Sequence, residues 1–248
     1  MEKLFLTIDT ETANTFDDPL CYDVGGCVHN EKGDVLETFS FVVYEIFFKE
    51  KELMENSYFA EKIPQYLEEI NNGSRKVARF STIKKEIAKI CKKYEIDGII
   101  AHNARFDYKS LTTTQRFLTS SKYRFFLPYG VPIYDTLKMA RNTIVKTDEY
   151  KIFCKENGFV AKNGNPRATA EVLYKFLTND LNFEESHTGL QDVLIEKEIF
   201  VKCLELDPQV EKECFTPKVY CKCGCACPMA RINGTCKKTD NICKWGNS

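Results

Sequence analysis

A nearly unbroken apolar segment close to the start of the chain, Leu4–Thr10, runs into two carboxylates, Asp9 and Glu11. Apolar residues in succession are typical of a strand that is buried on both faces. Side chains two positions apart on a strand point to the same face, so Asp9 and Glu11 are predicted to lie together at the strand's end. The fold must therefore cover this strand on both faces and still leave its end open to two charged groups.

Strand-like and helix-like segments alternate along the first 206 residues. We predict four further strands: Asp23–His29, Val35–Tyr44, Gly98–Ala101 and Ile133–Tyr134. Helical spacing of apolar residues predicts a helix ending near Tyr94 and others at Tyr108–Leu118, Thr136–Asn142, Ala168–Leu177 and Leu190–Leu206. Asn163–Gly164 predicts a tight turn. Three strands followed by alternating helices and strands indicate an α/β fold, with a mixed sheet flanked by helices on both faces.

Charge and cysteine content divide the chain into two parts. The whole chain has 35 Lys and Arg against 36 Asp and Glu, a formal charge of −1. Its last 35 residues hold six Lys or Arg, Asp240 as the only acidic residue and seven of the twelve cysteines, so this segment carries +5 and the remainder −6. We therefore expect a domain over residues 1–207 and a small, basic, cysteine-rich tail over residues 208–248. At 43% apolar residues the chain can bury a sizeable core.

No run of residues approaches the ~20 apolar positions that a membrane span needs. The apolar start, Leu4–Ile8, is followed at once by charged residues. The start is therefore expected to be neither a signal peptide nor a membrane anchor. We expect an intracellular, cytoplasmic protein with no membrane partner.

A second group of polar residues, His102–Asp107, follows the predicted strand Gly98–Ala101. Ligand crevices of open α/β sheets form at the carboxyl ends of strands, so Asp107 is a candidate to join Asp9 and Glu11. The alternative is structural: Asp107 would lie in the first turn of a helix and interact with its macrodipole.

The third signal is His187, followed five residues later by Asp192. Thr188 and Gln191 have the spacing of a capping box, which predicts that a helix begins there. Within one continuous helix, five residues would turn the two side chains about 140° apart, at about 100° per residue. With His187 ahead of the helix, both side chains can reach one site. The alternative is a partly exposed histidine beside a helix cap.

In this order the three motifs resemble those of the DEDDh (DnaQ-like) 3′–5′ exonucleases, a family of the RNase H-like superfamily. The family includes polymerase proofreading subunits, oligoribonuclease relatives and stand-alone phage enzymes, and a stand-alone phage-type member is one form that the chain could take. The resemblance covers about residues 1–206 and rests on Asp9, Glu11, Asn103, Phe106, Asp107, His187 and Asp192. It implies an RNase H-like, five-stranded mixed sheet in the order 3-2-1-4-5, flanked by helices, in which the first three carboxylates converge.

One position near the motifs departs from the family pattern, and another matches it. Family members often continue the first motif with Thr-Thr-Gly, where this chain has Thr12-Ala13-Asn14, so the close backbone approach that glycine allows is not expected here. Asp135, which opens the helix after the predicted strand Ile133–Tyr134, matches a frequent family aspartate. We predict that it caps that helix.

The resemblance also implies the chemistry. Two Mg²⁺ or Mn²⁺ ions would be held by four carboxylates, because oxygen ligands suit hard divalent cations; these are Asp9, Glu11, Asp107 and Asp192. His187 would be the general base that takes a proton from the attacking water. Substrate contacts would come from Thr10, Thr12, Asn103 and Phe106. For Phe106 a buried core role is the alternative.

The implied substrate is the 3′ end of a single-stranded or mismatched nucleic acid, which loses nucleoside monophosphates. DNA is favoured over RNA, although no residue that would contact a 2′-hydroxyl can be placed from the sequence.

The cysteines of the tail suggest a second kind of metal. Thiols stay reduced in a cytosol, where dense thiolates more often bind zinc than form disulfides. The candidate zinc ligands are Cys221, Cys223, Cys225, Cys227, Cys236 and Cys243. A reactive cysteine-rich end and a multinuclear metal cluster are the alternatives.

A different function stays open beside a stand-alone exonuclease. A proofreading or scaffold subunit on an exonuclease-like fold could bind a DNA polymerase or another replication protein through the tail. A scaffold that has lost its chemistry is disfavoured because all five motif residues are present: Asp9, Glu11, Asp107, His187 and Asp192.

Overall fold

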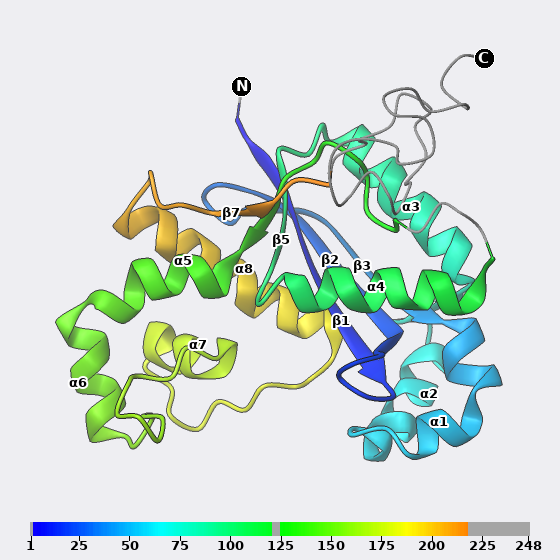
Figure 1. The fold of residues 1–248 in the computed structure, drawn as a ribbon, viewed down its shortest axis with the longest axis horizontal. Helices are drawn as coiled ribbons and strands as arrows, with labels where there is room; N and C mark the ends of the chain where they lie inside the picture. Colours follow the sequence, from blue (N-terminus) through cyan, green and yellow to red (C-terminus); the bar gives the residue numbers. More distant parts are fainter. Residues whose placement is uncertain (1, 121–124, 218–248) are drawn as a thin grey trace, which may run out of the picture.

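The first strand lies at the centre of a seven-stranded mixed sheet in a computed structural model that describes residues 2–120 and 125–217 (Figure 1). The strand order across the sheet is β4-β3-β2-β1-β5-β6-β7. The strands are β1 (Leu4–Ala13), β2 (Leu20–Asn30), β3 (Val35–Val43), β4 (Lys76–Ala78), β5 (Gly98–Ala101), β6 (Ile133–Asp135) and β7 (Glu213–Phe215).

Helices cover both faces of this sheet (Figure 1). Those that precede β6 in the chain are η1 (Glu45–Lys49), α1 (Lys51–Glu55), η2 (Ala60–Lys62), α2 (Ile63–Asn71), α3 (Phe80–Lys93) and α4 (Arg105–Leu118). Those that follow it are α5 (Thr136–Asn142), η3 (Ile144–Lys146), α6 (Asp148–Glu156), α7 (Ala170–Thr178) and α8 (Gly189–Leu206). None of the described helices has the length and apolar content that a membrane span requires.

The predicted fold class is confirmed, and the predicted sheet needs one correction. The expected five-stranded order corresponds to β3-β2-β1-β5-β6, with β2 antiparallel to β1 and β5 parallel to it. Two edge strands of three residues each, β4 and β7, extend the sheet to seven strands. Segments this short carry too little apolar periodicity to be predicted from the sequence.

The last described residues return to the sheet. β7 pairs antiparallel with β6, so part of the segment that was expected to belong to the tail adds a strand at the sheet's edge. The six candidate zinc ligands lie outside the described residues, and the zinc site stays a prediction.

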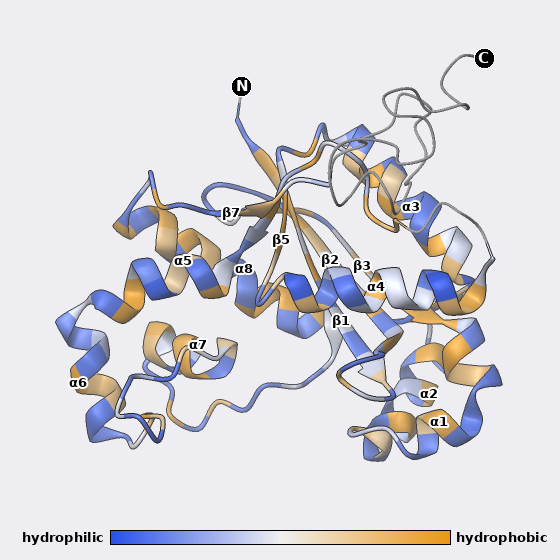
Figure 2. Ribbon diagram, in the orientation of Figure 1, coloured by the Kyte–Doolittle hydropathy of each residue, from blue (hydrophilic) through white to orange (hydrophobic). Residues whose placement is uncertain are grey.

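β1 presents its two faces to two separate hydrophobic clusters. The ring of Phe5 lies 4.9 Å from that of Phe200 in α8, in a cluster that also draws on α5, α6 and α7. Leu6 and Ile8 belong to the cluster on the other face, which includes residues of α3 and α4. In Figure 2 the central strands are coloured as hydrophobic along much of their length. Because side chains alternate along a strand, Asp9 continues the face that α8 covers.

The start of α8 packs directly on β2 through two glycines. A Cβ atom on Gly25 would lie 2.0 Å from the carbonyl carbon of Gly189, so no larger residue fits at this crossing. The N–H of Gly189 donates to Asp23 Oδ2 at 3.0 Å. The same carboxylate oxygen accepts from Tyr66 Oη at 2.7 Å and from Arg75 Nη1 at 2.5 Å. This buried network fixes where α8 begins.

We predict that Gly25→Ala lowers the free energy of unfolding by about 3 kcal/mol or more, because the methyl group cannot be accommodated without moving α8 away from the sheet. Gly73→Ala is the control. Gly73 has a φ of 81° but open space around it, so alanine there adds only backbone strain of about 1–2 kcal/mol. Urea denaturation measures both, and equal losses would contradict the proposed role of the glycine contact.

Candidate active site

The three predicted motifs meet in one cleft of about 1160 Å³. Its lining includes all five residues predicted to be catalytic: Asp9, Glu11, Asp107, His187 and Asp192. Asp9 and Glu11 come from β1, Asp107 from the first turns of α4, and Asp192 from the first turn of α8. The cleft therefore lies where the end of β1 meets the starts of two helices.

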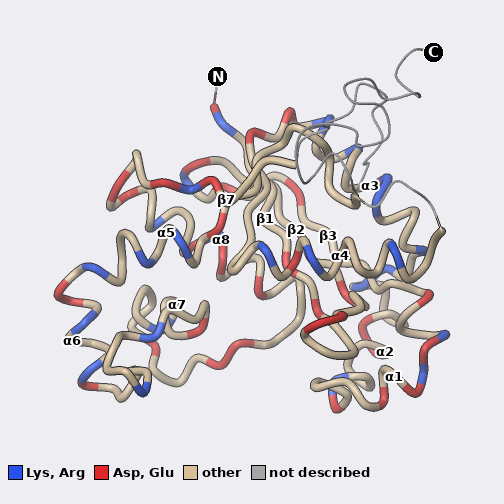
Figure 3. The backbone as a smooth tube through the Cα atoms, in the orientation of Figure 1, with Lys and Arg blue, Asp and Glu red and all other residues tan. Residues whose placement is uncertain are grey.

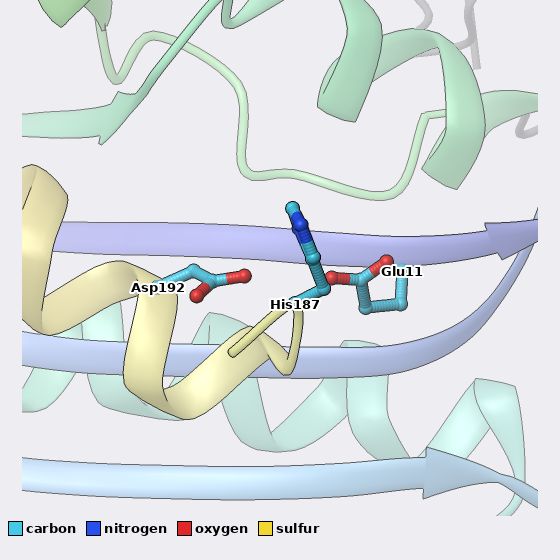
Figure 4. A group of neighbouring side chains, drawn as sticks. All are labelled: Glu11, His187 and Asp192. Atoms are coloured by element: carbon cyan, nitrogen blue, oxygen red, sulfur yellow. The ribbon is translucent and has the colours of Figure 1, made fainter. Parts of the chain in front are cut away.

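Glu11, His187 and Asp192 form the tightest group in this cleft. One ligand atom from each lies within 4.8 Å of the others. Figure 4 shows the carboxylates of Glu11 and Asp192 pointing toward each other, with His187 between them in the view. Two carboxylate oxygens and an imidazole nitrogen at this separation could hold a cation, or two carboxylates could hold it while the imidazole acts on a bound water.

The backbone around His187 explains how both His187 and Asp192 reach the site. α8 begins at Gly189, with Thr188 as its N-cap, and His187 has a left-handed φ of 47°. The predicted helix start is confirmed, but the predicted capping box is wrong. The hydroxyl of Thr188 lies 3.1 Å from that of Ser186 and makes no side-chain cap bond. Instead the N–H of Gly189 donates to Asp23 Oδ2, so the capping oxygen comes from β2 and not from the segment before α8.

Asp107 is held in place by Thr10. The N–H and the hydroxyl of Thr10 both lie within hydrogen-bonding distance of Asp107 Oδ1, at 3.1 and 2.9 Å, and both groups can donate to it. The hydroxyl of Ser110, one turn further along α4, lies 2.8 Å from that of Thr10. β1 and β5 are parallel neighbours, so the residues that follow β5 come to lie beside the end of β1. Thr10, which lies between Asp9 and Glu11 on β1, thus bonds Asp107 directly to the end of this strand.

His187 differs from the other two histidines. His29 and His102 each have both ring nitrogens within 3.0 Å of a hydrogen-bond partner, and burial lowers the pKa of each to about 4. The ring nitrogens of His187 have no hydrogen-bond partner among the described residues. Burial, and then the charge of Lys62, lower its pKa. It is therefore the histidine with a free nitrogen in the cleft.

A segment that sequence reasoning missed flanks His187. The ring of Phe59 stacks on the imidazole at 4.5 Å between centroids. The ammonium group of Lys62 lies 5.1 Å from the centre of the Phe59 ring and donates to the backbone carbonyl of Ser186. These contacts hold the left-handed turn before α8. Neither residue belongs to a motif, and only the fold brings η2 to this position.

Burial and mutual repulsion make the carboxylates of the cleft hard to ionise. Burial is the largest cause in each case; it raises the pKa of Glu11 to about 8, and those of Asp107 and Asp192 to about 7. The pKa of Asp9 is raised well above its usual range, first by burial and then by the charge of Glu196. Asp9 Oδ2 is buried and has no hydrogen-bond donor. The charge of Lys62 favours the ionised forms of Glu11 and Asp192, but no described residue forms an ion pair with any of the four carboxylates.

Glu196 is a further carboxylate of the cleft that the motifs did not reveal. Its side chain is 3% exposed and lines the cleft, one helical turn after Asp192 on α8. Burial raises its pKa well above the usual range, and the charges of Asp107 and Asp192 add to this shift. Residues four apart share a helix face, so its spacing from Asp192 was the available signal.

Three of the four residues predicted to contact substrate line the cleft. Thr10, Asn103 and Phe106 line the cleft, and Asn103 has a left-handed φ of 63°. The N–H of Asn103 donates to Asp135, which also accepts from Leu137 as the predicted cap of α5. Thr12 is not among the described residues that line the cleft. It follows an irregularity in the pairing of β1 with β2.

Asn14 takes the backbone conformation that the family's glycine would allow. Its φ is 72°, and its side chain donates to the carbonyl of Asp18 at 2.9 Å. Asparagine is among the non-glycine residues that best tolerate the left-handed region. Asparagine at this position therefore allows the left-handed turn that follows β1. The turn carries Phe16, which lines the cleft beside Phe106 at 6.2 Å between ring centroids.

No protein-family model matches the sequence, and a sequence search finds no curated relative. The structure is similar to that of a full-length 3′-exonuclease, with a TM-score of 0.54 and 13% identity over 85% of each chain. It is similar to cell-death related nuclease 4, with a TM-score of 0.55 and 11% identity, over 85% of this chain and 67% of that one. It is also similar to E. coli Exonuclease I in complex with a 5cy-dT13 oligonucleotide, with a TM-score of 0.53 and 12% identity.

These similarities establish the fold. The match to Exonuclease I covers 84% of this chain but 42% of the larger protein. The chain therefore shares the α/β fold of these nucleases, the fold class that the sequence predicted, and its function has to be argued from its own site.

The raised pKa values predict how stability depends on pH. An Asp or Glu in an unfolded chain titrates near ~4, whereas Glu11, Asp107 and Asp192 titrate at about 7 to 8 in the fold. A pKa that is raised on folding favours the folded state below the unfolded value, and this contribution is lost as the pH rises through the folded value. In EDTA, the melting temperature should therefore fall between about pH 5.5 and 8.5.

Added Mg²⁺ should oppose this fall by neutralising the carboxylates, and Asp192→Asn should make it shallower by removing one of them. Melting curves followed by circular dichroism, with EDTA and with Mg²⁺, measure both effects. A melting temperature in EDTA that rises over this range would contradict the electrostatic account.

Proposed function

We propose that the chain is a DEDDh-type 3′–5′ exonuclease that releases nucleoside monophosphates from the 3′ ends of single-stranded or mismatched DNA. The observation that carries the proposal is the meeting of Glu11, His187 and Asp192 within 4.8 Å, in a cleft that Asp9 and Asp107 also line. The similarity in fold to 3′-exonucleases supports it. The position of His187 ahead of α8 supports the DEDDh type.

Two Mg²⁺ or Mn²⁺ ions fit the chemistry of this site. The four motif carboxylates offer oxygen atoms, which are the ligands that hard cations prefer. Asp9 Oδ2 is buried and accepts no hydrogen bond. Glu11 and Asp192 would hold one ion, Asp107 the other, and Asp9 both. Bound there, the ions would lower the pKa of a water molecule and stabilise negative charge on the phosphate oxygens.

His187 would take the proton from the attacking water. Its lowered pKa keeps the imidazole neutral near pH 7, so a ring nitrogen has a free lone pair. Stacking on Phe59 fixes the plane of the ring, and the bond from Lys62 to Ser186 fixes the turn that carries it. A positioned general base of this kind contributes about 10²–10⁴-fold to the rate.

The cleft also offers the two kinds of contact that single strands need. Phe16 is 85% exposed and stands beside Phe106, so a base can stack against this pair. Besides Lys151, which pairs with Asp148, three exposed cations line the cleft from other segments: Arg141 of α5, Lys146 of η3 and Arg167 in the loop before α7. Their side chains have no hydrogen-bond or ion-pair partner among the described residues, which leaves them free for phosphates. Figure 3 shows segments of Lys and Arg, interspersed with Asp and Glu, around α5 and α6.

We expect metal-dependent shortening of a 5′-labelled single-stranded DNA from its 3′ end, with EDTA abolishing it and Mg²⁺ or Mn²⁺ restoring it. His187→Ala should lower kcat by about 10²–10⁴-fold with little change in KM, since the imidazole acts on the water and not on the strand. Gln191→Ala, an exposed position at the start of the same helix, is the control. RNA and a mismatched duplex complete the panel. Cleavage of a circular single strand, or near-normal activity of His187→Ala, would refute the assignment.

The three free cations are expected to determine strand binding. Replacing Arg141, Lys146 and Arg167 together with Gln should raise KM for a long single strand by roughly 10-fold or more at low salt and reduce the salt dependence of binding by about two units of log–log slope. The control replaces three surface lysines that already form ion pairs: Lys3, Lys89 and the partly exposed Lys202. An equal effect of both triple variants would show that overall charge matters and the cleft cations do not.

A further inference from the structure

Glu196 is buried in a place where the protein gives it little to bind. The side chain is 3% exposed, and its Oε2 atom has no hydrogen-bond partner. The backbone N–H of His102 interacts with the carboxyl group and favours its charged form. An unpaired carboxylate oxygen in a protein interior is unfavourable by about 1–3 kcal/mol or more, so its presence needs an explanation.

No cation within residues 2–120 and 125–217 supplies that explanation. Glu196 has no ion pair among the described residues. The neighbouring Lys197 points elsewhere: its ammonium group donates to the carbonyl of Gly33 at 3.0 Å and pairs with Glu198 at 2.7 Å. The charged groups that do act on Glu196 include the carboxylates Asp107 and Asp192, and Glu196 in turn acts on Asp9. Every one of these interactions is repulsive.

The position of Glu196 indicates what would complete it. It lines the same cleft as the motif carboxylates, one turn along α8 from Asp192. Its flanking residues on α8, Ile195 and Ile199, are buried in the hydrophobic cluster, so the helix holds the glutamate rigidly. Among the described residues that line this cleft, Asp9 Oδ2 is also a buried oxygen without a hydrogen-bond partner. A divalent cation bound by both groups would satisfy two oxygens that the protein leaves without partners.

We propose that Glu196 is a fifth carboxylate ligand of the metal site and shares a divalent cation with Asp9. The inference rests on the proposed function only in requiring that divalent cations bind in the cleft. It adds a residue outside the three motifs, and it predicts that metal affinity depends on a side chain that the motif residues do not include.

The test measures metal binding directly, by isothermal titration of the metal-free full-length protein with Mn²⁺. Glu196→Gln keeps the shape and can still accept from the His102 N–H, but it removes the negative charge. We expect at least ~10-fold weaker binding of one Mn²⁺ than in the wild type. Glu198→Gln, two residues further on α8 and half-exposed, is the matched control and should bind Mn²⁺ like the wild type. Circular dichroism confirms that each variant is folded.

Two further arms separate this inference from the proposed function. Asp192→Asn should weaken Mn²⁺ binding in any two-metal nuclease. If Asp192→Asn loses affinity while Glu196→Gln binds like the wild type, the fifth ligand is refuted and the proposed function stands. If the wild type binds no Mn²⁺, both fail. The rise in melting temperature on adding Mn²⁺ gives a second readout and should be smaller for Glu196→Gln than for Glu198→Gln.

Discussion

The site depends on one close contact, the crossing of α8 over β2 at Gly25 and Gly189. The two backbones approach so closely that either glycine would clash if it carried a Cβ atom, and the Gly189 N–H is bound by the buried Asp23. Everything functional on α8 takes its position from this point. His187 lies two residues before the crossing, Asp192 three residues after it and Glu196 one turn later. The network of Tyr66 and Arg75 around Asp23 links the helix start to the opposite part of the domain, and it replaces the local cap that the sequence suggested.

How far the sequence predicts this structure follows from the range of each signal. Strand alternation put Asp9 and Glu11 on one face, helical spacing put α8 after His187, and the Asn163–Gly164 turn closes a small bridge between Val160 and Pro166. Contacts between distant segments left no such trace. The segments that form α1, α2 and α6 were not predicted. Phe59 and Lys62, which lie between α1 and α2 and flank His187, were missed for the same reason. Glu196 could have been found, because a carboxylate four residues after a predicted ligand shares its helix face.

The cations at the cleft bear on how a domain with a net negative charge could bind a polyanion. Residues 1–213 carry −6, which repels a polyanion at long range, and the cleft itself is dense in carboxylates. At the Debye length of ~10 Å in ordinary salt, distant charges matter less than those next to the strand. The free cations Arg141, Lys146 and Arg167 lie at the cleft. Local attraction can therefore exceed the repulsion of the domain as a whole.

A fifth carboxylate ligand, Glu196, would change the balance of charge in the site. Four ionised carboxylates would match two divalent cations, so adding Glu196 leaves one negative charge in excess where a phosphate must bind. Lys62 is placed to offset it: its charge favours the ionised forms of Glu11 and Asp192, and its ammonium group is fixed to Ser186 beside the site. If Glu196 is a metal ligand, the positive charge of Lys62 would compensate its negative charge, although the two side chains form no ion pair. With the proposed cations in place, such a pair of charges would strengthen metal binding and still allow a negatively charged strand to enter the cleft.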